Sequence, residues 1–110
     1  MAAIDFEIDH FYAEMANIQL NLMDWEKWCS QYESFKDEYV WKTKNGDRIK
    51  VGDMSESHLE NAFNMVKRND PENGWNKIFE QEKTYRRLKN QIIQAREQLA
   101  YMEDISDMCL

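Results

Sequence analysis

Residues 4–32 read IDFEIDHFYAEMANIQLNLMDWEKWCSQY, and large apolar side chains recur in this stretch at alternating steps of four and three. The positions with this spacing are Ile4, Ile8, Phe11, Met15, Ile18, Leu22, Trp25, Cys29 and Tyr32. The same spacing returns near the end of the chain at Ile78, Tyr85, Ile92 and Leu99, interleaved with Leu88, Ala95 and Met102. A sustained period of 3.5 residues is typical of a long helix that buries one narrow seam. We therefore predict two long antiparallel helices, over about residues 3–36 and 75–103.

Between these helices the period changes from 3.5 to 2, which predicts a β-hairpin over about residues 39–51. A two-residue Asn45-Gly46 loop would place Lys42 on the apolar face. A three-residue loop, Lys44-Asn45-Gly46 with Gly46 at positive φ, separates the faces cleanly and is preferred. It places Tyr39, Trp41, Thr43, Ile49 and Val51 on one face and Lys42, Arg48 and Lys50 on the other.

A short helix is expected over about residues 55–68, because Leu59, Ala62, Phe63 and Val66 form an apolar stripe at helical spacing. Two pairs could cap its start, Asp53 with Glu56 or Ser57 with Glu60, and Ser55 is another candidate for its first position. The stretch 69–74 predicts a turn before the last helix. The expected fold is mainly α, in the order α-β-β-α-α, as a single domain over residues 1–110.

Some apolar side chains fall outside the two seams and widen the apolar stripe beyond what one partner helix covers. They are Tyr12, Leu20, Met23, Trp28, Phe35, Phe79 and Ile93. This excess favours a homodimer or an arrangement of three or four helices. We therefore expect a homo-oligomer.

The net charge of −7 is unevenly distributed, since residues 1–38 contain nine acidic residues and only Lys27 and Lys36 as bases. Between Lys77 and Arg96, six bases oppose only Glu80 and Glu82. Such an acidic first helix and a locally basic last helix suit an antiparallel pair. The overall negative sign makes direct binding of nucleic acid unlikely on electrostatic grounds.

No motif with catalytic or metal-binding spacing stands in the sequence. His10 and His58 are the two histidines, the two cysteines are far apart, and the three glycines are isolated. We expect a protein that is not an enzyme and needs no cofactor or metal. Acidic residues near the N-terminus do not fit a signal peptide, and no window of 18 apolar residues occurs. The expected location is the cytoplasm.

Two surfaces are candidate binding sites. The bases Lys42, Arg48 and Lys50 could contact an RNA backbone from one face of the hairpin. The acidic first helix could instead imitate nucleic-acid phosphates and occupy a basic groove of another protein. On that interpretation the partner-binding residues are Asp24, Glu26 and Glu33, beside exposed aromatic anchors such as Trp28.

Residues 41–61 read WKTKNGDRIKVGDMSESHLEN, with a turn glycine, alternating aliphatics, then Asp-Met and His-Leu-x-Asn. This segment resembles one found in small proteins of bacteriophages and prophages. The resemblance implies a phage-type accessory protein in the bacterial cytoplasm. We expect it to bind a host protein, most directly as an inhibitor of an anti-phage defence system such as a CRISPR effector nuclease. The alternatives are a coiled-coil adaptor that homo-oligomerises and an RNA-binding hairpin module.

Overall fold

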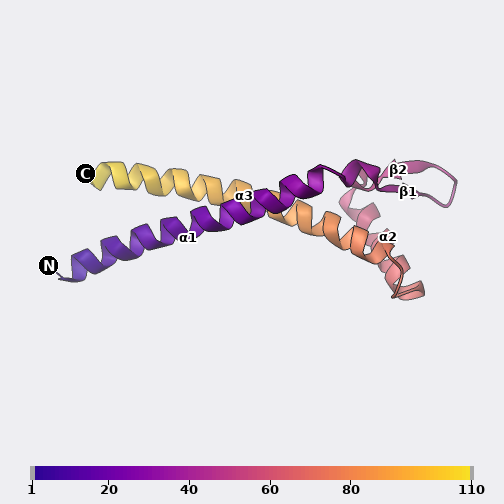
Figure 1. Cartoon of the computed structure of the whole chain (residues 1–110), viewed down its shortest axis with the longest axis horizontal. Helices are drawn as coiled ribbons and strands as arrows, with labels where there is room; N and C mark the ends of the chain where they lie inside the picture. Colours follow the sequence, from indigo (N-terminus) through magenta and orange to yellow (C-terminus); the bar gives the residue numbers. More distant parts are fainter. Residues whose placement is uncertain (1, 110) are drawn as a thin grey trace. The chain divides into compact units, whose positions relative to one another are not determined.

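The computed structural model describes residues 2–109, with side chains described for residues 9–108. In chain order the elements are α1 (Ala2–Glu33), the 3₁₀ turn η1 (Lys36–Glu38), β1 (Val40–Lys42), β2 (Arg48–Lys50), the 3₁₀ turn η2 (Val51–Asp53), α2 (Glu56–Asn69) and α3 (Trp75–Cys109). Figure 1 shows this order along the ribbon. The expected class, mainly α with a small antiparallel hairpin, is confirmed.

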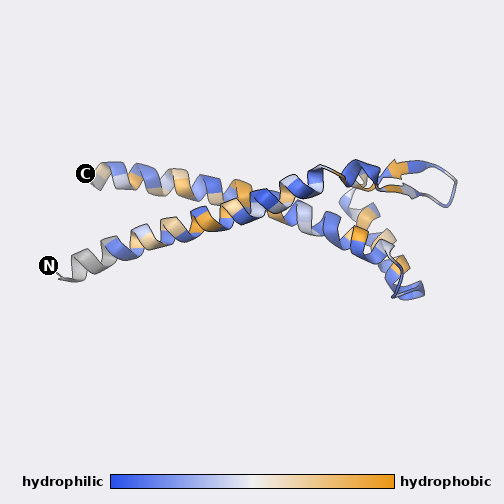
Figure 2. Cartoon of the chain, viewed as in Figure 1, coloured by the Kyte–Doolittle hydropathy of each residue, from blue (hydrophilic) through white to orange (hydrophobic). Residues whose placement is uncertain are grey.

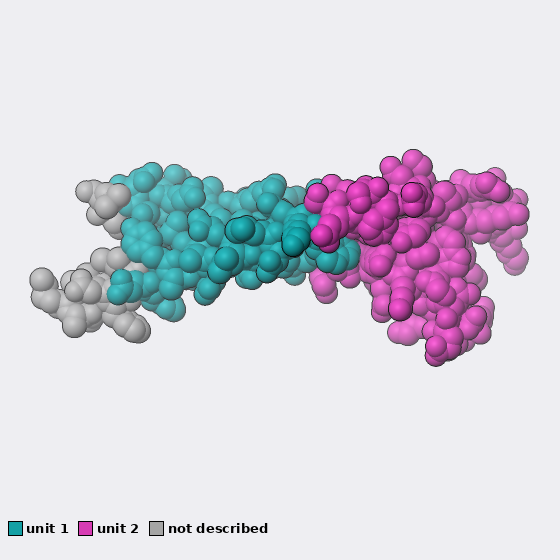
Figure 3. Space-filling model, viewed as in Figure 1, with its two compact units in different colours: residues 1–28, 88–110 teal, residues 29–87 magenta. Residues whose placement is uncertain are grey.

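The chain divides into two compact units (Figure 3). Unit 1 comprises residues 1–28 and 88–110, and unit 2 comprises residues 29–87. Both long helices contribute to each unit, because α1 and α3 continue through the two points of division. The single-domain expectation stays a prediction, and the units are described separately below.

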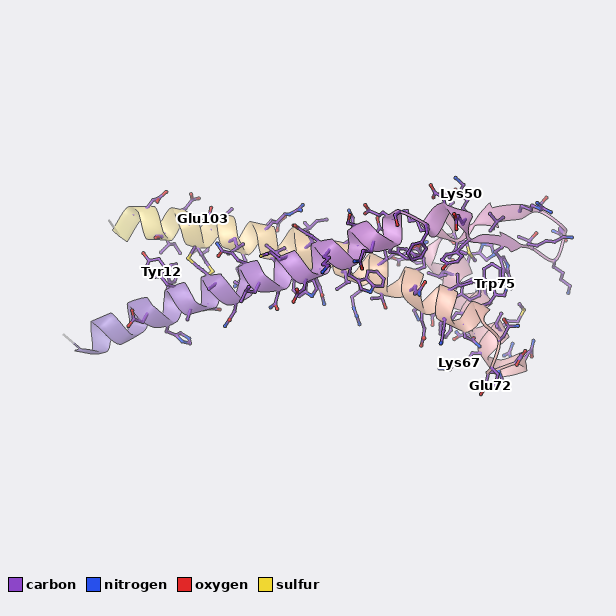
Figure 4. All side chains as sticks on the ribbon, viewed as in Figure 1. Tyr12, Lys50, Lys67, Glu72, Trp75 and Glu103 are labelled. Carbon is purple, nitrogen blue, oxygen red and sulfur yellow. The ribbon has the colours of Figure 1, made fainter. Side chains whose placement is uncertain are left out.

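In unit 1, α1 and α3 run antiparallel. The hydroxyl of Tyr12, which is labelled in Figure 4, is hydrogen-bonded to the Ser106 hydroxyl at 3.1 Å. The Arg96 guanidinium donates to Glu26 at 2.6 Å. The predicted seam is confirmed for the described residues of the unit. On α1, Phe11, Met15, Ile18, Leu22 and Trp25 are buried or half-buried, and on α3 the buried residues are Leu88, Ile92, Ala95, Leu99 and Met102.

The ends of the long helices differ from the prediction. Helix α1 ends at Glu33 rather than near 36, because the Ser34 hydroxyl donates to the Gln31 carbonyl at 2.6 Å and the Phe35 amide bonds back to Tyr32 in 3₁₀ fashion. Helix α3 continues to Cys109 instead of ending near 103. Ile105 is still half-buried, and no glycine or proline follows Gly74 to interrupt the helix.

The hairpin, in unit 2, has the predicted register. Val40 pairs with Lys50, Trp41 with Ile49 and Lys42 with Arg48. The Thr43 amide donates to the Asp47 carbonyl at 2.8 Å, which leaves a three-residue loop that ends at Gly46 with φ of 88°. Only glycine adopts that conformation without strain. The chain leaves the hairpin at Val51, which begins η2 rather than extending β2.

The core of unit 2 lies between the hairpin, α2 and the start of α3. Its buried residues are Val51, Met54, Leu59, Ala62, Phe63, Val66 and Phe79. Trp41 packs edge-on against Trp75 and Phe79, with ring centroids 5.0 and 5.2 Å apart (Trp75 is labelled in Figure 4). Phe79 is 0% exposed, so the prediction that it widens the apolar stripe beyond what one partner helix covers was wrong. The hairpin covers this residue, which the heptad pattern alone does not reveal.

Helix α2 is capped by Ser55, whose hydroxyl accepts the His58 amide at 3.1 Å. Neither of the two expected capping pairs forms, because Asp53 lies within η2 and Ser57 lies inside the first turn of the helix. Leu59 is buried, as the apolar stripe predicts.

Candidate functional site: exposed surfaces of the two units

A buried ion pair holds η2 against α3 in unit 2. Glu82 is 1% exposed, and its two carboxylate oxygens accept from the Tyr32 hydroxyl and from Arg86 Nε, each at 3.1 Å. Arg86 Nη2 donates to the Met54 carbonyl at 2.6 Å. Longer contacts to the carbonyls of Val51 and Gly52 complete the set, at 3.3 and 3.4 Å. Arg86 therefore positions the backbone of η2, and Glu82 positions Arg86.

The surroundings of Glu82 are consistent with a structural role. A Cβ added at Gly52 would lie 3.5 Å from the Glu82 carboxylate, so the backbone approaches the acid closely. Burial raises the pKa of the Tyr32 phenol, and the neighbouring Glu82 charge raises it further. The Tyr32 phenol thus keeps its proton near neutral pH, and its hydrogen bond to Glu82 is a fixed structural contact.

The predicted basic face of the hairpin is present. Lys42, Arg48 and Lys50 are exposed, while Trp41 and Ile49 on the opposite face are half-buried (Lys50 is labelled in Figure 4). Within residues 9–108 no acid forms an ion pair with these three bases. The hairpin therefore presents an uncompensated positive strand face.

The four residues expected to bind a partner have different surroundings. Asp24 is exposed on α1 in unit 1, whereas Trp28 is half-buried and not the exposed aromatic that we expected. Glu26 accepts from Arg96 at 2.6 Å in that unit, so an intramolecular ion pair already engages it. Glu33 belongs to unit 2, where the Tyr85 hydroxyl donates to it at 2.6 Å. A partner-binding role for the set stays a prediction, with Asp24 the most available acid.

The sequence reasoning missed an acidic and apolar surface on the last turns of α3. Tyr101 is 67% exposed and Met108 is 84% exposed. Four acids and no base follow Arg96, namely Glu97, Glu103, Asp104 and Asp107. Tyr101 falls outside the seam spacing and was a detectable signal, whereas Met108 lay beyond the predicted helix end.

A shallow groove lies between α2 and the start of α3, with Phe63, Lys67 and Glu80 along its length. The ammonium groups of Lys67 and Lys83 cover the Phe63 ring at 5.7 and 5.1 Å. Lys83 also bonds Glu60 at 2.7 Å and lowers the pKa of that carboxyl. Lys67, Lys83 and Glu80 all line the groove, so it carries charges of both signs and does not favour a ligand of one charge.

His10 is exposed and His58 supplies its backbone amide to the α2 cap. Across the part of the chain that the structure describes, no three metal-ligating side chains come together, and no helix is long and apolar enough to cross a membrane. Comparison with models of protein families, with curated proteins and with solved structures gives no match.

Proposed function

We propose that this chain is a non-catalytic accessory protein that acts by binding another protein. The observation that carries the proposal is the excess of exposed apolar surface on unit 1, whose seam is already filled. Its exposed large side chains are Tyr12, Leu20, Met23, Ile93, Tyr101 and Met108, with exposed fractions from 47% to 84%. Apolar residues alternate with polar ones along both long helices (Figure 2). Clustered exposed apolar groups rimmed by polar residues are typical of protein-binding surfaces.

The charge of this surface supports one kind of partner. Asp24 on α1 and the four acids that follow Arg96 on α3 give unit 1 a negative exterior. A basic groove that normally holds nucleic-acid phosphates would attract it, with aromatic anchors such as Tyr101 and Trp28 supplying contact energy. Combined with the phage-type segment at residues 41–61, this supports an inhibitor of a bacterial defence nuclease, such as a CRISPR effector. Such an inhibitor would act in the host cytoplasm by steric occlusion or phosphate mimicry.

The test is capture from nuclease-treated bacterial lysate with the intact chain, followed by titration of each captured protein's nucleic-acid binding. The proposal expects one stoichiometric partner that added DNA or RNA displaces. It also expects a double variant, Tyr101→Ser with Asp104→Lys, to lose that partner. Lys44→Glu, on the exposed hairpin loop, is the matched control and should bind normally. A partner that ignores both nucleic acid and the double variant would refute this mode of binding.

A second candidate function is RNA binding by the hairpin, which the position of Lys42, Arg48 and Lys50 on one exposed face favours. Three phosphate contacts to a single strand predict a slope of about −2 in log affinity against log salt concentration. A gel-shift series with single-stranded RNA, comparing the natural chain with Arg48→Glu, measures it. Absence of a shift at low salt would exclude this candidate.

A further inference from the structure

Helix α1 carries a second stripe on the face opposite its seam. The members are Asp9, Ala13, Ala16, Leu20, Met23 and Lys27, at steps of four, three, four, three and four. All six side chains are exposed, with Leu20 at 59% and Met23 at 65%. Residues at these steps share one face of a helix. From residue 10 to residue 23 the only charged side chain is Glu14, which lies outside the stripe, so the centre of this face is uncharged.

We propose that this outer stripe is a self-association surface, occupied by the same stripe of a second copy in antiparallel orientation. A two-fold axis beside Ile18 makes the stripe complementary to itself in charge and in size. Asp9 of one copy then faces Lys27 of the other. Ala13 faces Met23, and Ala16 faces Leu20, so every large side chain meets a small one. An isologous contact requires this kind of self-complementarity.

The residues beside the stripe fit the same axis. On one side of the stripe, His10 lies opposite Asp24 of the second copy, and Asn17 lies opposite Asn17 of the second copy. On the other flank Tyr12 lies opposite Glu26 of the second copy, and Gln19 meets Gln19. Within residues 9–27 no acid faces another acid, although this helix carries most of the chain's negative charge. A parallel pairing would instead set Asp9 against Asp9 and Lys27 against Lys27, and like charges in contact oppose association. The antiparallel pairing is therefore the one that the charges allow.

The extent of the stripe indicates a weak, reversible dimer. Residues 9–27 span about 28 Å of helix. One stripe of this length buries less area than the roughly 800 Å² per partner of a standard interface, so we expect a dissociation constant of about 10 to 500 μM. The dimer would cover Leu20, Met23 and the surroundings of Asp24 on α1, and would leave Ile93, Tyr101 and Met108 on α3 available to another protein. The inference therefore does not depend on the proposed function.

Sedimentation velocity and light scattering of the purified full chain, from about 10 μM to 1 mM, test the dimer directly. Leu20→Gln should weaken self-association by about tenfold or more, because each dimer buries two copies of this side chain. Ile93→Gln, which alters a 53%-exposed side chain outside the stripe, is the matched control and should leave association unchanged. A monomer at every concentration would overturn the proposal, as would equal effects of the two variants. A larger oligomer that survives Leu20→Gln would also overturn it.

A charge exchange tests the orientation separately. Asp9→Lys and Lys27→Asp should each weaken the dimer several-fold, because each sets like charges opposite one another twice per dimer. The double variant, with both charges exchanged, should recover the affinity of the natural chain. Circular dichroism of each variant verifies that the helices are intact. Failure of the double variant to recover the affinity would overturn the antiparallel pairing.

Discussion

Replacing Arg86 by methionine should destabilise unit 2 strongly, because it leaves the carboxylate of Glu82 buried and uncompensated. Glu82 is 1% exposed and would keep only the Tyr32 hydroxyl as a donor. Breaking a buried pair in this way costs about 3–5 kcal/mol. Since the Arg86 side chain is 23% exposed, water can enter its place, and we expect a cost of about 3 kcal/mol. That is a large fraction of the roughly 5–15 kcal/mol typical of a small domain.

The double variant Glu82→Leu with Arg86→Met should be less damaging than the sum of its parts. Glu82→Leu alone should cost about 1–2 kcal/mol, because Arg86 keeps its carbonyl contacts and some water. Removing both charges abolishes the need to solvate either, so the pair should cost about 2 kcal/mol and show coupling of about 2 kcal/mol or more. Denaturant unfolding followed by circular dichroism measures all three free energies. Arg87→Met, at the exposed neighbouring position, is the control.

Two results would refute this reasoning about the ion pair. One is an Arg86→Met variant within 1 kcal/mol of the natural chain. The other is a double variant whose cost equals the sum of the single ones. Amide hydrogen exchange gives a local readout, because Arg86 holds the carbonyls of η2. Exchange at Met54, whose amide bonds to the Val51 carbonyl, should accelerate in Arg86→Met and not in Arg87→Met.

Three further outcomes are expected in unit 2. Gly46→Ala should lower the free energy of unfolding by about 1 kcal/mol or more, measured by denaturant titration, because φ is 88° there. Ser55→Ala should cost about 0.5–2 kcal/mol in the same assay through loss of the cap to His58, and Ser55→Asp should retain most of it. The pKa of Tyr32 is raised in the folded chain, so unfolding above pH 10 releases its proton and stability falls as pH rises. Tyr32→Phe should therefore flatten the alkaline decline by up to about 1.4 kcal/mol per pH unit, and an unchanged slope would contradict the assignment.

The local elements were predictable from the sequence because their signals are local. The heptad spacing identifies the seam of unit 1, and the alternation around Gly46 identifies both the hairpin register and its basic face. The ends of the long helices were less predictable. Ser34 diverts the Gln31 carbonyl at the end of α1, and α3 continues through Ile105 because nothing interrupts it.

The tertiary contacts were not predictable, because they join residues far apart in the chain. Phe79 looks like a surplus apolar residue until the hairpin is seen to cover it through Trp41. In the sequence Glu82 looks like an exposed acid of a charged helix. Only its contacts with Tyr32 and Arg86 show that it is the buried member of an ion pair. Of the predicted partner-binding acids, Glu26 already carries an ion pair that no spacing rule assigns to it.

The long sequence separations within the Arg86 cluster also bear on how the chain reaches its folded state. Arg86 meets carbonyls more than thirty positions earlier in the chain, and Glu82 meets a hydroxyl fifty positions earlier. Closing loops of this length costs entropy, and that cost is part of the folding barrier. The ion pair also needs exact side-chain geometry, so we expect it to form only after these segments have met, late in folding. Weakening it should accelerate unfolding and leave the refolding rate nearly unchanged, so the ion pair mainly governs how long the native state persists.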